Sequence, residues 1–225
     1  MRTFETYDAV NIPKTELKPY VYKNLALLMA GDWFLDKGLA KLIVDAIPAV
    51  ERFEAREGFE DPAETELSKI ITEPLKEVYT MPFFSKEFCN MLIDEIDNME
   101  KTIGFAPNEE EMPQHQINEF VLQEHAQDLY ISFMKIVLSK MNVVFETIWN
   151  RQVVAGGIQL ANYNPRGIKQ TAWHHDSLSD ISVVVPLNTG DYTGGGTEFH
   201  KRGKIAPLPT GNALIFPSFT HLHRG

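Results

Sequence analysis

The chain has few of the features that mark secreted, disulfide-bonded or membrane-spanning proteins. Its 225 residues include one cysteine, Cys89, which excludes an internal disulfide and fits a reducing compartment. No run of about 18 apolar residues, the length that spans a bilayer, is present, and the start, MRTFETYDAV, lacks the apolar region of a secretory signal. We therefore expect a soluble cytoplasmic protein without a membrane partner.

Basic residues are also scarce. Lys and Arg number 21 against 31 Asp and Glu, which gives a formal net charge of −10. This balance argues against chain-wide binding to nucleic acid, and we expect no nucleic-acid partner. The composition is otherwise 44% hydrophobic and 11% aromatic, enough for a folded core in one domain or in one domain with an extension.

The first part of the chain carries apolar residues at helical spacing. Residues 21–30 and 35–57 both show this period, with Pro48 as the expected position of a break or kink. A further helical pattern runs from residue 117 to about residue 141. These segments predict a helical layer, and we assign residues 1–75 to an N-terminal helical extension.

A predicted strand and a predicted loop lie between these helical patterns. Residues 76–84, KEVYTMPFF, alternate enough to predict a strand, and Ser85 is a residue type that commonly caps the start of a helix. Residues 104–116 carry two prolines and a glycine without periodicity, which predicts a loop. The sequence leaves open whether this loop is a lid over a functional site or an ordinary surface loop.

After Trp149 the sequence consists of short runs of strand-forming residues, and Gly, Pro and Asn residues separate these runs. Several short strands at this spacing are typical of a β-sandwich or barrel. Helices followed by strands predict an α+β fold in which a helical layer packs against a small β-roll. The runs are QVVAGGIQLANYNP, DISVVVPLNT, GGGTEFHKRGKIAPL and GNALIFPSF.

The stretch TAWHHDS contains a candidate pair of metal ligands, His174 and Asp176. In a strand, side chains two residues apart point to the same face, so these two would converge while His175 points away. Two histidines and one carboxylate on one face of an octahedral ion form the facial triad of non-haem Fe(II) oxygenases. His-x-Asp alone occurs by chance in many chains, so a third ligand is needed.

The segment FTHLHRG at the end of the sequence offers that third ligand. It contains His221 and His223, which are two residues apart and therefore share one strand face, so geometry alone does not choose between them. Between the two segments lies YTGGGTEF, a glycine-rich turn that would let the backbone pass close to a site.

The order of these motifs resembles the Fe(II)/2-oxoglutarate-dependent dioxygenases, and more narrowly the prolyl/lysyl hydroxylase branch. The similarity is greatest to the catalytic domain of the procollagen lysyl hydroxylases and runs from about residue 76 to the end. It implies a dioxygenase domain at 76–225 with a double-stranded β-helix (jelly-roll) core. The motifs that carry it are HHDS, PLN, DYTGGGTEF, THLHRG and MPFFSKEFCNMLIDEID.

The resemblance also implies the site residues and cofactors. His174, Asp176 and His223 would bind Fe(II), and Tyr163 in LANYNP would contact 2-oxoglutarate, with O2 and ascorbate as further cofactors. The family places an arginine about ten residues beyond the distal histidine, where it pairs with the far carboxylate of 2-oxoglutarate. Because the sequence stops at Gly225, we expect it to be incomplete at that end; Arg224 is too near His223 along the chain to be an obvious substitute.

The function implied is hydroxylation of a protein or peptide side chain, lysyl before prolyl, with succinate and CO2 as co-products. Lysyl hydroxylases of this type can dimerise, so the resemblance also allows a homodimer of this chain. Two alternatives stay open: a hydroxylase of the same superfamily that acts on a free amino acid, and a catalytically silent β-roll that binds a partner.

The other candidate residues have simpler interpretations. His115, His125 and His200 are expected at the surface or in loops. His175 is expected either to support the ligands from behind or to be structural, and Trp173 is expected to be an aromatic residue of the core or of the rim of the site.

Overall fold

The computed structural model describes the chain from residue 20 to residue 225 with short gaps. The expected start of the helical extension, most of the loop at 104–116 and His115 lie outside the described residues, so the lid interpretation stays a prediction. The described residues are 20–29, 31–54, 65–104, 106–107, 117–154, 156–164 and 167–225, with the backbone alone for 48–54.

Helices dominate the first two thirds of the described chain. A π-helical turn, Val137–Met141, joins α4 to α5, so that these two form one continuous helical run. In the residues that the structure describes, short 3-10 helices lie at Leu25–Leu28, Asp32–Phe34 and Ser68–Ile70. The α-helices are α1 (Lys37–Glu54), α2 (Lys86–Thr102), α3 (Leu122–His125), α4 (Gln127–Ile136) and α5 (Asn142–Trp149).

Within the described part of the chain, the strands form three antiparallel sheets with the orders β1-β2-β9-β6, β10-β7-β8 and β3-β4-β5. Most strands lie after Trp149, as the sequence predicts. The strands are β1 (Thr72–Leu75), β2 (Val78–Pro82), β3 (Ala106–Pro107), β4 (Asn118–Val121), β5 (Gln159–Asn162), β6 (Ile181–Val184), β7 (Thr197–Phe199), β8 (Gly203–Ile205), β9 (Asn212–Pro217) and β10 (His223–Arg224).

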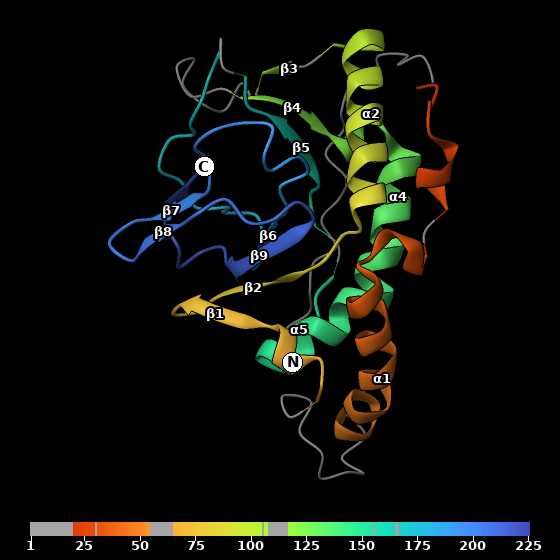
Figure 1. The fold of residues 1–225 in the computed structure, drawn as a ribbon, viewed down its shortest axis with the longest axis vertical. Helices are drawn as coiled ribbons and strands as arrows, with labels where there is room; N and C mark the ends of the chain where they lie inside the picture. Colours follow the sequence, from red (N-terminus) through yellow and green to blue (C-terminus); the bar gives the residue numbers. More distant parts are fainter. Residues whose placement is uncertain are drawn as a thin grey trace, which may run out of the picture.

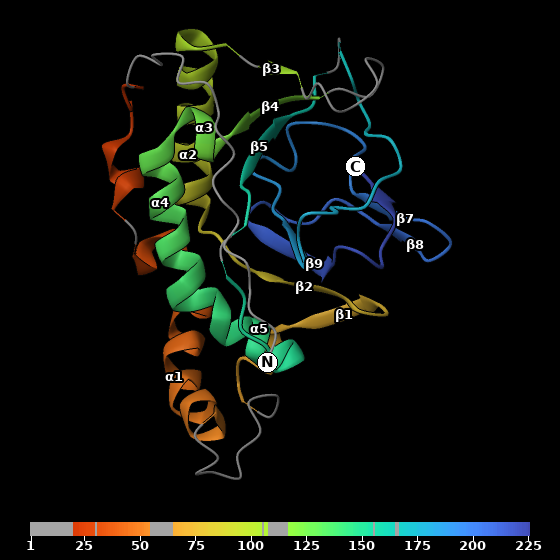
Figure 2. The ribbon, with the colours of Figure 1, turned by 180° about the vertical axis from the view of Figure 1, so that it is seen from behind.

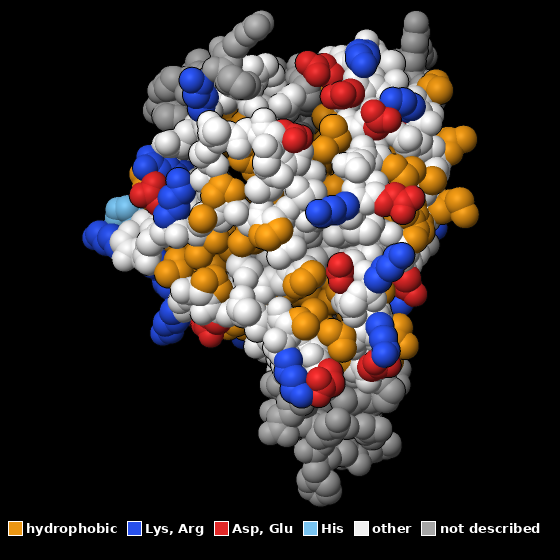
Figure 3. All heavy atoms as spheres, in the orientation of Figure 1, with side chains coloured by type: hydrophobic (Ala, Val, Ile, Leu, Met, Phe, Trp, Pro, Cys, Tyr) orange, Lys and Arg blue, Asp and Glu red, His pale blue; other side chains and the backbone are white. Residues whose placement is uncertain are grey.

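Helices and sheets occupy opposite sides of the molecule. The long helices α1, α2 and α4 lie together, and the strands lie beside them, in both the front and the back view (Figures 1 and 2). The predicted α+β class is therefore confirmed, and the antiparallel sheets are compatible with a jelly-roll core. Charged side chains of both signs, with exposed hydrophobic ones between them, cover the face in Figure 3. None of the helices in the described residues is long and apolar enough to cross a membrane.

Local signals in the sequence located α2 and β2 correctly. The Oγ atom of Ser85 accepts a hydrogen bond of 3.1 Å from the backbone N–H of Phe88, so Ser85 is the N-cap of α2 as predicted. The strand expected at 76–84 is β2, which pairs with β9 in the centre of the four-stranded sheet. The helix expected at 35–57 is α1, which runs through Pro48 without the break that the sequence allowed there.

Two helix predictions are wrong. Residues 118–121, at the start of the expected helix 117–141, form β4, because their backbone pairs with β3 on one side and with β5 on the other. The expected helix at 21–30 is reduced to the 3-10 helix Leu25–Leu28. Its preceding backbone N–H groups bind the carboxylate of Glu95 on α2 instead of helical carbonyls. In both segments contacts with distant parts of the chain override local periodicity.

One hydrophobic core joins the helices to the four-stranded sheet. It contains Leu39 and Ile43 of α1, Phe88 of α2, Phe133 of α4 and Ile215 of β9, and all five are at most 7% exposed. Burial of this apolar surface is the main force that holds the two layers together. Residues on both sides of position 75 contribute to it, and the division into two domains at that position stays a prediction.

The glycine-rich turn before β7 yields a test of the packing. At Gly196 φ is +89°, and an added Cβ would lie 2.3 Å from the carbonyl oxygen of Ile205. At Gly194 φ is +88°, but a Cβ there would meet no atom within 4 Å. We expect Gly196→Ala to lower the free energy of unfolding by roughly 3–5 kcal/mol, because backbone strain and overpacking add together. Gly194→Ala should cost about 1 kcal/mol, since only the strain applies.

Urea unfolding of the two variants beside the wild type measures this difference. Equal losses in both variants would contradict the packing described for Gly196. The structure thus shows that this glycine lets the backbone of residues 205–207 approach closely.

Candidate metal centre

Strand β10 brings the end of the chain against the TAWHHDS stretch. The backbone N–H of His174 donates to the carbonyl of His223 at 2.9 Å, and the N–H of His223 donates back to His174 at 2.9 Å. Further along, Thr171 N–H donates to the carbonyl of Gly225 at 3.0 Å. This antiparallel pairing places the two histidine side chains next to each other, with ring centres 4.4 Å apart.

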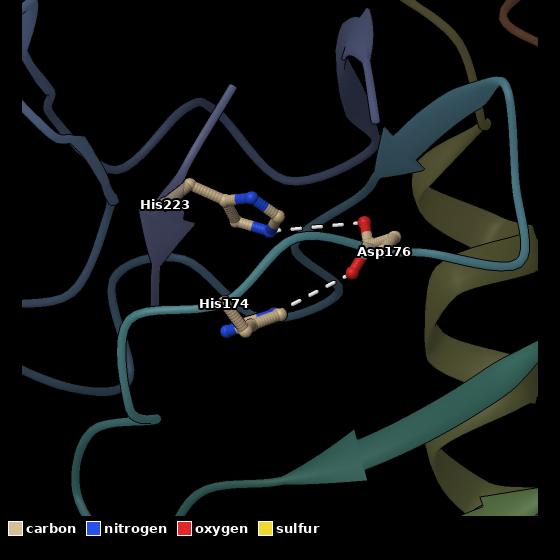
Figure 4. A group of neighbouring side chains, drawn as sticks. All are labelled: His174, Asp176 and His223. Carbon is tan, nitrogen blue, oxygen red and sulfur yellow. Dashed lines mark ion pairs between the residues drawn. The ribbon is translucent and has the colours of Figure 1, made fainter. Parts of the chain in front are cut away.

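His174, Asp176 and His223 converge on one point (Figure 4). The Nε2 atom of His174 lies 3.5 Å from Oδ1 of Asp176, and Nε2 of His223 lies 3.7 Å from its Oδ2. One donor atom from each of the three lies within 4.8 Å of the others. The His223 side chain is 6% exposed, whereas those of His174 and Asp176 are 33% and 35% exposed. The cluster is therefore closed on the His223 side and open to solvent on the other.

The expected strand accounts for only part of this convergence. His174 pairs with His223 as an isolated bridge, and Asp176 lies beyond it in a segment without regular structure. The carboxylate therefore reaches the histidines through the course of the loop rather than through strand alternation.

Backbone carbonyls fix the protonation pattern of both histidines. Nδ1 of His174 lies 2.8 Å from the carbonyl oxygen of Ala172, and Nδ1 of His223 lies 2.9 Å from that of His221. A carbonyl oxygen only accepts hydrogen bonds, so each Nδ1 carries the proton. Each Nε2 then presents its lone pair toward Asp176, which is the tautomer that binds a metal ion.

The electrostatic surroundings favour the ionised carboxylate and the neutral imidazole. Burial pushes the pKa of Asp176 upward, but the adjacent His174 side chain, the hydrogen bond from Ser182 and the proximity of His223 outweigh it and leave the pKa below its usual value. Burial lowers the pKa of His223 and outweighs the opposing effects of its hydrogen bond to His221 and of the Asp176 charge. Both groups are thus in the states that ligate metal near neutral pH.

His221 is engaged elsewhere. It is fully buried, its Nδ1 lies 2.9 Å from the hydroxyl of Thr220, and its Nε2 lies 3.3 Å from the backbone oxygen of Lys76. Its ring also packs against those of two buried phenylalanines. Of the two histidines that the sequence left open, the structure brings His223 to the cluster and keeps His221 in the surrounding core.

The buried histidines predict a pH-dependent stability of the metal-free protein. Burial lowers the pKa of both His221 and His223 from the ordinary value of 6.5, so the unfolded chain takes up protons more readily. The free energy of unfolding should therefore fall as the pH drops from about 6.5 toward the folded pKa values. Urea unfolding at a series of pH values measures this free energy, and His221→Gln should weaken its dependence on pH. A stability that rises over this window would contradict the burial of the two neutral rings.

Arg224 is held on the opposite face of β10 from His223. Its guanidinium lies 4.4 Å from the ring centre of Trp173, and its Nη2 donates to Oε2 of Glu198 at 2.6 Å. This arrangement ties β10 to both neighbouring segments. Arg224 is therefore occupied away from the cluster. Trp173 is partly exposed and packs against Arg224 and His200, so it is not a core residue, and a place at the rim of the site stays a prediction.

Tyr163 follows β5 and reaches the same end of the chain. A Cβ built on Gly225 would lie 2.8 Å from its hydroxyl oxygen, so that hydroxyl lies beside the chain two residues after His223. Its side chain is about half exposed. A role in binding 2-oxoglutarate stays a prediction.

The remaining described histidines lie outside the cluster. His175 and His200 are exposed, and the ring of His200 packs against Trp173. Nδ1 of His125 contacts the backbone oxygen of Val121 at 2.8 Å. In the part of the chain that the structure describes, the three converging side chains are the one group of His, Cys, Asp or Glu able to hold a metal ion.

Sequence reasoning missed Ser182, which contacts the carboxylate of Asp176, and Ser218, which contacts Ser182. The Ser182 hydroxyl donates to Oδ2 of Asp176 and lies 2.8 Å from the hydroxyl of Ser218. Each serine lies within an otherwise apolar run, DISVVV or ALIFPSF. A buried hydroxyl requires a hydrogen-bond partner, so a serine in such a run is the sequence signal that could have indicated this contact.

The donor set fits Fe(II). Two imidazole nitrogens and one carboxylate oxygen, with one side open, match the ligands and the free positions of the facial triad. The fixed Nδ1 protons and the ionised carboxylate supply the donor states that such a site requires.

Comparisons with known proteins bear on the family of the chain. A family model described as the OGFOD2-like domain, a 2-oxoglutarate/Fe(II) oxygenase-like domain, matches residues 40–148 and ends before the converging side chains. The chain is 27% identical over 169 residues to the multifunctional procollagen lysine hydroxylase and glycosyltransferase of Caenorhabditis elegans. It is 25% identical over 172 residues to human procollagen-lysine,2-oxoglutarate 5-dioxygenase 2, and 26% identical over 167 residues to human LH3, another such multifunctional enzyme.

These alignments cover 69% of the chain but only 22–23% of each relative, so the chain spans less than a quarter of their length. They confirm the resemblance to the Fe(II)/2-oxoglutarate-dependent dioxygenases that the motifs indicate, and at the family level they support a 2-oxoglutarate-dependent hydroxylase.

Proposed function

Given this resemblance, we propose that the chain is an Fe(II)/2-oxoglutarate-dependent dioxygenase that hydroxylates a protein or peptide side chain, lysyl in preference to prolyl. The observation that carries the proposal is the convergence of His174, Asp176 and His223, whose donor atoms lie within 4.8 Å of one another. The proposal includes a jelly-roll core and a dioxygenase domain over residues 76–225.

In this proposal each residue has a defined task. The Nε2 atoms of His174 and His223 and the carboxylate of Asp176 hold the iron, and the hydroxyl of Tyr163 contacts the cosubstrate. Bound Fe(II) with 2-oxoglutarate would supply O2 activation coupled to decarboxylation, which yields succinate and CO2. The exposed side of His174 and Asp176 is the side from which substrate enters, while the buried side of His223 excludes water.

Two observations favour a lysyl side chain. The curated relatives are procollagen lysine hydroxylases by name, and those proteins act on a protein substrate. The net charge of −10 is also complementary to a cationic side chain.

Product analysis tests the proposal. The protein is incubated with Fe(II), 2-oxoglutarate and O2 together with a lysine-containing peptide, a proline-containing peptide or free lysine. We expect succinate to form and mass spectrometry to show the addition of one oxygen atom to the lysine peptide in preference to the others. Oxygen addition to free lysine alone would favour the small-molecule hydroxylase, and an absence of both metal binding and succinate would favour a binding module.

A further inference from the structure

The carboxylate of Asp176 is connected to two buried serines. The hydroxyl of Ser182 donates a hydrogen bond to Oδ2 of Asp176, and the two serine hydroxyl oxygens lie 2.8 Å apart. Ser182 is 8% exposed and Ser218 is fully buried, so neither hydroxyl has bulk water as an easy substitute partner.

The chemistry of these groups determines which hydroxyl donates and which accepts in each hydrogen bond. An ionised carboxylate only accepts hydrogen bonds, and each serine hydroxyl has one proton to donate. The proton of Ser182 is used on Asp176, so in the contact between the two serines it is Ser218 that donates. The hydrogen bonds therefore run from Ser218 to Ser182 to Asp176, and such chains strengthen their members through mutual polarisation.

The two serines are fixed by the four-stranded sheet. Ser182 lies on β6, where it is paired with Phe216 of β9, and Ser218 directly follows β9. The backbone N–H of Ser218 donates to the carbonyl of Asp180 at 3.0 Å, which closes the end of this strand pair. Asp176, by contrast, lies in a segment without regular structure. The serine chain thus anchors a loop carboxylate to a rigid part of the fold.

We propose that Ser182 and Ser218 are positioning residues that set the orientation of the Asp176 carboxylate for metal binding. The hydrogen bond from Ser182 is made to Oδ2, which lies 3.7 Å from Nε2 of His223, and in this proposal Oδ1, 3.5 Å from Nε2 of His174, is the oxygen left to bind the metal ion. This inference deepens the proposed function and rests on its metal site. Ser218 acts on the site through Ser182, although it contacts none of the three ligands directly.

Metal affinity in the absence of turnover tests the inference. Mn(II) serves as the probe, and free Mn(II) is followed by electron paramagnetic resonance during titration of the full chain. We expect Ser182→Ala to weaken Mn(II) binding by about 10–100-fold, which is the usual effect of removing a partner of a ligand. Ser218→Ala should weaken it by a smaller factor, about 3–10-fold, because it acts through a second hydrogen bond. Ser182→Thr keeps the hydroxyl and should restore most of the affinity.

The double variant separates a directed chain from general packing. In the Ser182→Ala background, Ser218→Ala should cause no further loss of affinity, since its hydrogen bond no longer reaches the carboxylate. Multiplicative losses in the double variant would overturn the inference. Ser177→Ala is the matched control, because Ser177 is an exposed serine directly after Asp176 and should retain wild-type affinity.

The wild type and His174→Ala distinguish failure of this inference from failure of the proposed function. If the wild type binds no Mn(II), or if His174→Ala binds it equally well, the metal site itself is disproved. If the wild type binds one ion that His174→Ala loses, while Ser182→Ala keeps wild-type affinity, only the positioning role is disproved. Thermal unfolding of each metal-free variant verifies that the chains compared are folded.

Discussion

Replacing His174 or Asp176 by alanine is expected to abolish the formation of succinate from 2-oxoglutarate. Each change removes one of three donor atoms that converge within 4.8 Å, and two remaining protein ligands hold a divalent ion poorly. Because the metal ion carries the chemistry, we expect turnover to fall by ~1,000-fold or more. The measurement is Fe(II)-dependent succinate release at saturating 2-oxoglutarate.

His175→Ala is the matched control for these two variants. His175 lies between the two ligands in the sequence but is exposed and outside the cluster, so its replacement should leave most of the activity. Full turnover in His174→Ala or in Asp176→Ala would refute the assignment of these ligands. A loss in all three variants would mean that the HHD stretch is needed only for folding.

The second large effect concerns stability. Glu95 of α2 is fully buried, and its carboxylate accepts hydrogen bonds from the backbone N–H groups of Lys23 at 3.1 Å and Asn24 at 2.7 Å, and from the hydroxyl of Tyr20. Burial, followed by the hydrogen bond and charge of Glu95, raises the pKa of Tyr20, so its hydroxyl stays protonated and donates. Glu95→Ala leaves these donors without their acceptor and should lower the free energy of unfolding by roughly 3–5 kcal/mol.

The neighbouring carboxylate supplies the control. Asp94 forms an ion pair of 2.8 Å with the Lys23 ammonium group, and both side chains are about half exposed. Asp94→Ala should therefore cost less than about 1 kcal/mol. Urea unfolding of the two variants measures the difference, and limited proteolysis should cut residues 20–35 faster in Glu95→Ala. Equal losses of stability in the two variants would contradict the role given to Glu95 as the anchor of residues 20–28.

The sequence predicted those parts of the fold that depend on local signals. The cap at Ser85 requires only a side chain and the backbone three residues away, so its position could be predicted directly. The strand at 118–121 could not, because its backbone is paired by β5, about forty residues later. The segment at 21–28 likewise depends on the carboxylate of Glu95, which lies far away along the chain.

The candidate site was likewise predictable from the sequence only in part. The residue types and order of His174, Asp176 and His223 identified the cluster, but the choice between His223 and His221 came from the family pattern and not from strand geometry. The backbone pairing of β10 with His174 and the enclosure of His221 became visible only in three dimensions. The serines behind Asp176 were missed because a hydroxyl in an apolar strand does not reveal its partner.

The most direct test of the central claim is an anaerobic calorimetric titration with Fe(II). The wild type is compared with two variants that carry the same substitution two residues apart, His221→Asn and His223→Asn. We predict one Fe(II) per chain in the wild type and in folded His221→Asn, and no Fe(II) bound by His223→Asn. Undiminished Fe(II) binding by His223→Asn would contradict the claim that His174, Asp176 and His223 form the iron site.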